Sequence, residues 1–101
     1  MSKVKKGLAL IIANAEYQSQ PKLPSCCKDG ADMKSKLEEL NFDVLYYADT
    51  TRAITLDAIA EFIKLADCYS VLLMYYAGHG VQIDGENFFV PIDCTYTPIK
   101  S

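Results

Sequence analysis

Three runs of residues, each about as long as one β-strand, constrain the fold of this chain more than any other feature. They lie at 7–13 (GLALIIA), 42–48 (FDVLYYA) and 70–77 (SVLLMYYA). The first and third are apolar almost throughout, which is typical of strands covered on both faces of a sheet. The second is rich in residues that favour strands. The sequence therefore predicts three strands of one buried sheet.

The segments between these runs have the apolar spacing of amphipathic helices. Within 29–41, the apolar residues Met33, Leu37 and Leu40 recur at helical intervals, and charged residues fill the positions between them. Thr51 suits the N-cap of a second helix. The predicted apolar stripe of that helix consists of Ile54, Ala58, Ile59, Phe62, Ile63 and Ala66.

Two strand–helix–strand units in succession predict an α/β fold in three layers. Such crossovers are nearly always right-handed, so the strands form a parallel sheet flanked by helices, and the commonest small solution has the spatial order 2-1-3. In that order the loops that begin at Asn14 and Gly78 line a crevice at the carboxyl ends of the strands. After the third predicted strand and its loop, the pattern predicts a hairpin of segments 81–83 and 87–90 that turns at Asp84 and Gly85.

His79, the single histidine of the chain, lies between two glycines directly after the third predicted strand. Imidazole is the side chain whose ordinary pKa suits proton transfer near neutral pH. Flanking glycines allow a substrate backbone to approach closely. The alternative is a loop histidine without chemistry, in which Gly78 and Gly80 serve only the turn.

The segment LLMYYAGHGVQIDGENFFVPID, which contains His79, resembles the block around the catalytic histidine of caspases, metacaspases and paracaspases. The two tyrosines before AGHG and the VPID after the hairpin are most similar to paracaspases. KGLALIIAN resembles the first strand of that family, and PKLPSCCKDGADMKSKLEELNFDV resembles its first helix and second strand. The resemblance thus covers most of the chain and implies a caspase-like fold.

The resemblance implies a cysteine endopeptidase in which a cysteine attacks the scissile carbonyl and a thioester acyl-enzyme is then hydrolysed. It gives His79 the role of acid-base partner. It also implies that the backbone N–H of Gly80 is one donor of the oxyanion hole.

The nucleophile is the part of this chemistry that we do not find in the sequence. In caspases the cysteine follows the histidine by about 50 residues, which lies past the last residue of this chain. The four cysteines, Cys26, Cys27, Cys68 and Cys94, are predicted to be packed or exposed thiols, although Cys94 could approach the crevice. We therefore expect residues 1–101 to be the N-terminal, p20-type part of a caspase-like domain, incomplete before the catalytic cysteine and inactive alone.

Asp29 is the second candidate site residue. In paracaspases and metacaspases an acidic residue at the start of the first helix contributes to a pocket for arginine or lysine, and Asp29 matches that position. The alternative is an aspartate that caps the helix and complements its dipole. The one arginine, Arg52, is predicted to lie away from the crevice, so this part of the chain offers no arginine to bind a substrate aspartate.

The composition favours a globular domain without a nucleic-acid or membrane partner. Apolar residues make up 50% of the chain, and the net charge is −3, so there is no basic excess. No apolar run approaches the length of a membrane span, and cytoplasmic localisation is expected. A single histidine and the absence of CxxC spacing argue against a zinc site, and no cofactor is expected.

The expected partners are a peptide or protein substrate and, along the third strand, the rest of a caspase-like domain or a caspase-like partner. The alternative function is a non-catalytic interaction or regulatory module of the same fold. A flavodoxin-like nucleotide binder is disfavoured, because the loop after the first strand has no glycine-rich phosphate cradle.

Overall fold

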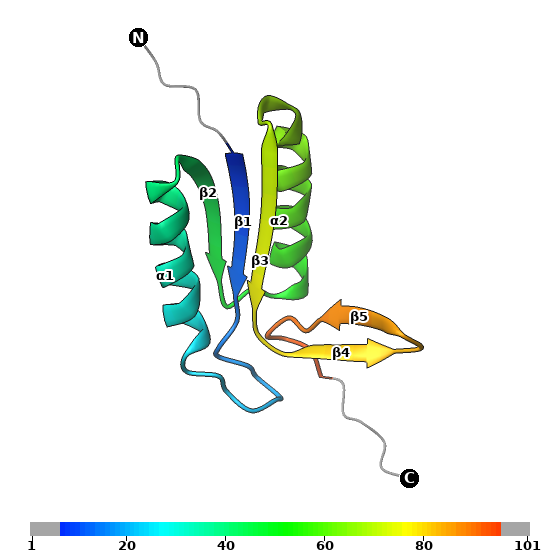
Figure 1. The fold of residues 1–101 in the computed structure, drawn as a ribbon. Helices are drawn as coiled ribbons and strands as arrows, with labels where there is room; N and C mark the ends of the chain where they lie inside the picture. The colour runs from blue at the N-terminus through cyan, green and yellow to red at the C-terminus, as the bar shows by residue number, and fades with distance from the viewer. Residues whose placement is uncertain (1–6, 96–101) are drawn as a thin grey trace.

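The computed structural model describes residues 7–95 and has the predicted α/β architecture. Strands β1 (Gly7–Ala13), β2 (Phe42–Ala48) and β3 (Val71–Ala77) form one parallel sheet in the order β2-β1-β3. The predicted strands and their order are thus confirmed, with β3 one residue shorter than expected. Figure 1 shows β1 in the centre of this sheet, and all its residues are buried.

The two predicted helices are present, and the first is longer at its start. Helix α1 spans Cys26–Glu39, so it begins three residues before the predicted Asp29. Helix α2 spans Arg52–Leu65 and is followed by a short 3₁₀ helix, η1, at Ala66–Cys68. The Thr51 hydroxyl oxygen accepts a hydrogen bond from the Ile54 N–H at 3.2 Å, which confirms the predicted N-cap.

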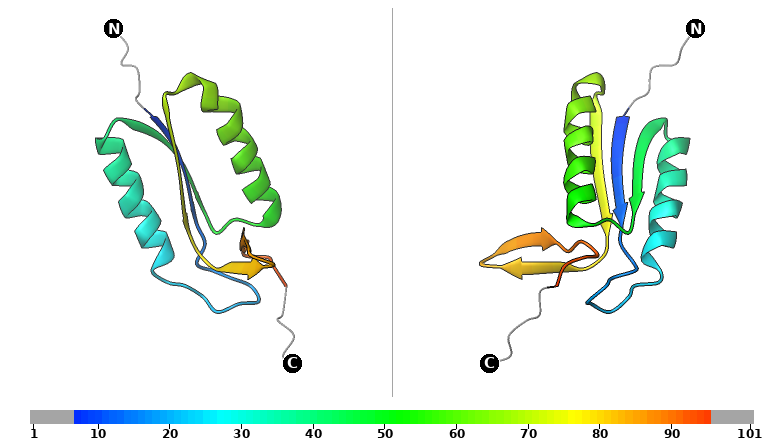
Figure 2. Two further views of the ribbon diagram at one scale, coloured as in Figure 1. Left: turned by 45° about the vertical axis from the view of Figure 1, so that its right-hand side comes forward. Right: turned by 180° about the vertical axis from the view of Figure 1, so that it is seen from behind.

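The helices lie on opposite faces of the sheet and enclose one apolar cluster each (Figure 2). On one face Ala9 and Ile11 of β1 pack with Leu37 of α1. On the other face Leu10 and Ile12 pack with Ala58 of α2. Successive side chains of a strand point to opposite faces, so a continuous apolar run in β1 supplies both clusters.

The predicted apolar stripe of α2 is wrong at two positions. Ala58 is buried, and Ile59 and Phe62 pack against its cluster, but Ile54 and Ile63 are 46% and 66% exposed. The helix packs on β1 and β2, and this contact covers a narrower face of α2 than its apolar residues occupy. Helical periodicity shows which residues share a face, whereas the neighbouring sheet decides how much of that face is covered.

The predicted hairpin forms a second, two-stranded antiparallel sheet of β4 (Gly80–Ile83) and β5 (Glu86–Phe89). Asp84 and Gly85 link the strands with φ angles of 51° and 82°. Positive φ at both central residues is the geometry of the tight hairpin turn that Asp-Gly favours. Figure 1 shows this hairpin projecting sideways from the carboxyl end of β3.

No helix in the part of the chain that the structure describes is long and apolar enough to cross a membrane.

Candidate active site

The loops after β1 and β3 meet at the carboxyl ends of the parallel strands, as predicted. The Asn14 N–H donates to the Ala77 carbonyl at 2.8 Å, so the hydrogen bonding between these strands continues into the loops. The Gln18 N–H donates to the Ile92 carbonyl at 3.0 Å, which joins the loop after β1 to the segment after β5. His79 therefore lies where three segments distant in sequence come together.

The His79 ring is fixed by a hydrogen bond to the backbone of the loop after β1. Its Nε2 lies 2.7 Å from the Pro21 carbonyl oxygen. A carbonyl can only accept, so Nε2 carries a proton, and in the neutral ring Nδ1 is then the free acceptor. The Tyr17 ring packs edge-on against the imidazole, with ring centroids 4.6 Å apart. This arrangement leaves Nδ1 as the nitrogen that can take a proton from a reacting group.

The backbone of His79 is held by two tyrosine hydroxyls. The His79 N–H donates to the Tyr17 hydroxyl at 2.8 Å, and the Tyr76 hydroxyl donates to the His79 carbonyl at 2.7 Å. The sequence analysis did not identify Tyr17 as a site residue. Tyr76 lies in the predicted third strand, and its ring also packs against the apolar cluster of Leu10, Ile12 and Ala58 between the sheet and α2.

The Gly80 N–H points away from the hairpin ladder. The Val90 N–H donates to the His79 carbonyl at 3.0 Å, so His79 and Val90 occupy a hydrogen-bonded position of the ladder. Gly80 pairs with Phe89 at the next position. Hydrogen-bonded and non-hydrogen-bonded positions alternate along antiparallel strands, so the Gly80 N–H is not used by β5.

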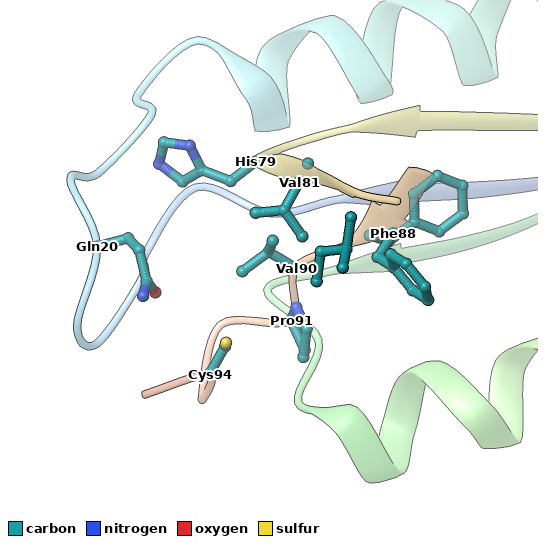
Figure 3. Close-up of a pocket in the computed structure, with 10 residues that line it drawn as sticks. Gln20, His79, Val81, Phe88, Val90, Pro91 and Cys94 are labelled. Carbon is teal, nitrogen blue, oxygen red and sulfur yellow. The ribbon is translucent and has the colours of Figure 1, made fainter. Parts of the chain in front are cut away.

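A cavity of about 360 Å³ opens beside His79 and Gly80 (Figure 3). Its walls are mostly apolar and include Val81, Phe88 and Pro91. Cys94 also lines it.

The other three thiols lie elsewhere. Cys68 is exposed at the end of η1. Cys26 and Cys27 begin α1, and burial raises the pKa of both thiols, with a further increase from nearby carboxylates. A raised thiol pKa reduces the thiolate fraction at neutral pH, which is the opposite of what a nucleophile requires.

Asp29 lies in the first turn of α1 and faces a different hollow from His79. That hollow, of about 230 Å³, is also lined by Asp32, Lys36 and Tyr75. Within residues 7–95 the structure gives the Asp29 carboxylate no hydrogen bond, and Ser25 occupies the N-cap. The structure therefore brings the loop before α1 to His79, but it does not bring the Asp29 side chain into the same cavity.

Asp49 is a further polar residue of this region that the sequence analysis did not single out. One carboxylate oxygen accepts hydrogen bonds from the N–H groups of Ala15 and Glu16, both at 2.9 Å. Asp49 has a positive φ of 55°, a conformation that aspartate adopts more readily than most residues. Its position directly after a predicted strand, next to the crevice, was the signal that could have revealed it.

Among residues 7–95 there is no group of three or more His, Cys, Asp or Glu side chains that could hold a metal ion.

Comparison with known proteins gives one family and two curated relatives. The sequence model of the family described as "Caspase domain" matches residues 6–101. "Mucosa-associated lymphoid tissue lymphoma translocation protein 1" of Homo sapiens is 37% identical over 89 residues, which is 88% of this chain. The homolog of that protein in Mus musculus has the same identity over the same length. The chain spans 11% of the length of each relative.

Proposed function

Because this chain belongs to the caspase domain family of peptidases, we propose that it supplies the histidine side of a cysteine endopeptidase site. The observation that carries the proposal is the bond between His79 Nε2 and the Pro21 carbonyl at 2.7 Å. It fixes the ring and leaves Nδ1 as a base at the open end of a parallel sheet. In this role Nδ1 takes the proton of a cysteine thiol, and the thiolate attacks the scissile carbonyl.

The remaining steps use the same groups. The Gly80 N–H donates to the oxygen on which negative charge develops. The protonated His79 then gives its proton to the departing amine as the C–N bond breaks. A water molecule, deprotonated by His79, hydrolyses the thioester and releases the acid and the free thiol.

We propose that none of the four cysteines of this chain is the nucleophile, so that residues 1–101 alone do not hydrolyse peptides. Cys94 lines the His79 cavity, but it follows His79 by too few residues for the crossover to a further parallel strand. The raised pKa of Cys26 and Cys27 and the distant location of Cys68 do not suit them to the role.

For specificity we propose cleavage after arginine or lysine, with Asp29 as a residue of the pocket. Asp29 and Asp32 line one hollow on α1, and the nearby Lys28 forms an ion pair with Asp32 at 2.8 Å. Of the two carboxylates in this hollow, Asp29 is thus the one that remains for a cationic side chain. Arg52 begins α2 and is not among the residues that line the His79 cavity, which does not suit it to bind an acidic side chain there.

The proposal is tested by joining this segment to the remaining part of a relative's catalytic domain and assaying hydrolysis of an arginine peptide. His79→Ala should lower kcat/KM by about 10²- to 10⁴-fold, the usual contribution of an acid-base residue. Gln82→Ala, at an exposed position of β4, is the control and should keep the activity. Equal activity of the His79→Ala variant would refute the role of His79.

The 101-residue chain alone should show no hydrolysis in the same assay. Hydrolysis that iodoacetamide abolishes, and that Cys94→Ala removes, would instead identify Cys94 as the nucleophile.

The second candidate function is that of a non-catalytic module that binds a caspase-like partner. The observation that favours it is the β3 edge, where Leu72 and Met74 are 48% and 41% exposed. We propose that the rest of a caspase-like domain, or a caspase-like chain, pairs with this edge. Binding of such a partner by the 101-residue chain, together with a joined protein that hydrolyses no peptide, would support the module over the enzyme.

A further inference from the structure

The ladder of the β4–β5 hairpin ends at His79, where a tyrosine hydroxyl replaces one hydrogen bond. A hydrogen-bonded antiparallel pair exchanges two bonds, so the His79 N–H would ordinarily donate to the Val90 carbonyl. Only the reverse bond, from the Val90 N–H to the His79 carbonyl, is direct. The His79 N–H donates instead to the Tyr17 hydroxyl at 2.8 Å, and that hydroxyl donates to the Val90 carbonyl at 2.9 Å. The Tyr17 oxygen is therefore inserted between the two strands.

A second hydroxyl, that of Tyr76, lies next to the Tyr17 hydroxyl. The Tyr76 hydroxyl lies 2.7 Å from the His79 carbonyl oxygen and 3.1 Å from the Tyr17 oxygen. Each hydroxyl has one proton to donate. The shortest contacts assign the Tyr17 proton to Val90 and the Tyr76 proton to His79. With this assignment both backbone polar groups of His79 are bonded to a tyrosine.

The packing around the two hydroxyls leaves them little freedom to move. Tyr17 is 2% exposed. Burial raises the pKa of the Tyr17 hydroxyl, so it keeps its proton at neutral pH. A Cβ atom at Gly78 would lie 2.6 Å from the Tyr76 oxygen and 2.7 Å from the Tyr17 oxygen. The first glycine of the GHG triplet thus provides the space that both hydroxyls occupy.

We propose that Tyr17 and Tyr76 form a hydroxyl clamp that positions His79, holding its backbone so that the ring reaches the Pro21 carbonyl. The clamp rests on the proposed function, in which His79 is the base. Neither tyrosine hydroxyl bonds to the imidazole nitrogens, so both are positioning residues rather than catalytic ones.

The geometry predicts unequal effects for the two hydroxyls. Tyr17→Phe removes the acceptor of the His79 N–H and the donor that bridges to Val90. Tyr76→Phe leaves the His79 carbonyl with its bond from the Val90 N–H. A buried donor without a partner costs more than a carbonyl that keeps one of two donors. Tyr17→Phe should therefore disturb His79 more than Tyr76→Phe does.

The clamp can be tested without peptidase activity, because His79 is the only histidine of the chain. The ¹⁵N NMR signals of its ring report which nitrogen is protonated and how rigidly the ring is held. For the 101-residue chain we expect one tautomer, with the proton on Nε2. In Tyr17→Phe the ring ¹⁵N signals should move toward those of an imidazole that exchanges between its two tautomers. Hydrogen exchange of the His79 amide should become about tenfold faster, as expected for the loss of one hydrogen bond.

Tyr69→Phe is the matched control. It removes a hydroxyl that donates to Asp43 at 2.6 Å, next to the opposite end of β3. The ring signals and the amide exchange of His79 should stay unchanged in this variant. Amide exchange of Ile11, in the buried central strand, reports whether each variant keeps its fold.

Two results would overturn the clamp: averaged tautomers in the unmodified chain, or unchanged His79 signals and exchange in a folded Tyr17→Phe variant. If the Tyr17→Phe variant does not fold, the same measurements on the Tyr76→Phe variant test the proposal. Unchanged His79 signals in that variant would refute it. A joined protein without hydrolysis but with the expected NMR signals would refute the proposed function alone. Normal hydrolysis with averaged tautomers would refute the clamp alone.

Discussion

Asn14 is almost completely buried, with 1% of its surface exposed, although its side chain is polar. Its Oδ1 accepts hydrogen bonds from the N–H and the hydroxyl of Thr50, at 2.8 and 3.1 Å. Its Nδ2 lies 3.5 Å from the Val90 carbonyl. A buried amide is costly unless it is hydrogen-bonded. With these bonds Asn14 joins the segments that follow β1, β2 and β5, and so supports the loops around His79.

At Asp29 the proposed pocket and a purely structural role make different predictions. In the joined protein, Asp29→Asn keeps the size of the side chain and removes its charge. If Asp29 binds the substrate cation, kcat/KM for an arginine peptide should fall about ten- to hundredfold, the value of a charge-assisted hydrogen bond. The melting temperature should change little, because the structure gives the carboxylate no hydrogen bond within residues 7–95.

The control for this experiment is Asp57→Asn, at an exposed position of α2. It makes the same chemical change away from the Asp29 hollow and should leave kcat/KM unaltered. Undiminished cleavage by Asp29→Asn, or a preference of the parent protein for aspartate peptides, would show that Asp29 does not bind the substrate.

At the scale of elements, the two helices begin in different ways. The Thr51 hydroxyl accepts the Ile54 N–H at the start of α2, whereas Ser25, at the same position of α1, makes no side-chain bond to the helix. Thr51→Ala should therefore lower the free energy of unfolding by about 1 kcal/mol, the usual value of a capping bond. Denaturant titration measures this change.

Ser25→Ala is the matched comparison for Thr51→Ala. It deletes a hydroxyl from the equivalent N-cap and should cost much less, since the Ser25 side chain makes no capping bond. Equal losses of stability in the two variants would mean that the observed Thr51 bond is not what stabilises the start of α2.

For the whole molecule, the β3 edge strand of the parallel sheet is more exposed than the β2 edge strand. Within the described residues β3 pairs with β1 alone, so its other edge has unpaired backbone groups. Leu72 and Met74 are exposed on the same strand. A long apolar edge strand is a template for pairing with another chain. We therefore expect the 101-residue chain to self-associate unless a partner covers this edge.

Sedimentation velocity over a range of concentrations tests this expectation. Met74→Lys should shift the chain toward monomer, because a charged side chain at an edge opposes strand pairing. Leu56→Lys, at a position of α2 that is 50% exposed, makes the same change away from the sheet and should not alter association. A monodisperse monomer of the unmodified chain at high concentration would contradict the prediction.

The features that follow from neighbouring residues could be predicted from the sequence. Strands β1 and β2, the turn at Asp84 and Gly85 and the N-cap Thr51 lie where expected. The strand order was also predictable, because crossover handedness restricts the possible topologies. The start of α1 was missed although Ser25 is of a type common at N-caps, because the apolar helical spacing begins only at Met33.

The sequence by itself determined that a single histidine follows a buried strand in a chain that resembles caspase-like peptidases. Only the tertiary structure decided what holds that histidine. Pro21 and Tyr17 precede His79 by 58 and 62 residues, and both bond to it directly. Periodicity and turn rules act over a few residues, so they identify the strands but not the polar groups that meet when distant loops converge. Contacts between such distant groups depend on tertiary packing, which also separated Asp29 from the His79 cavity.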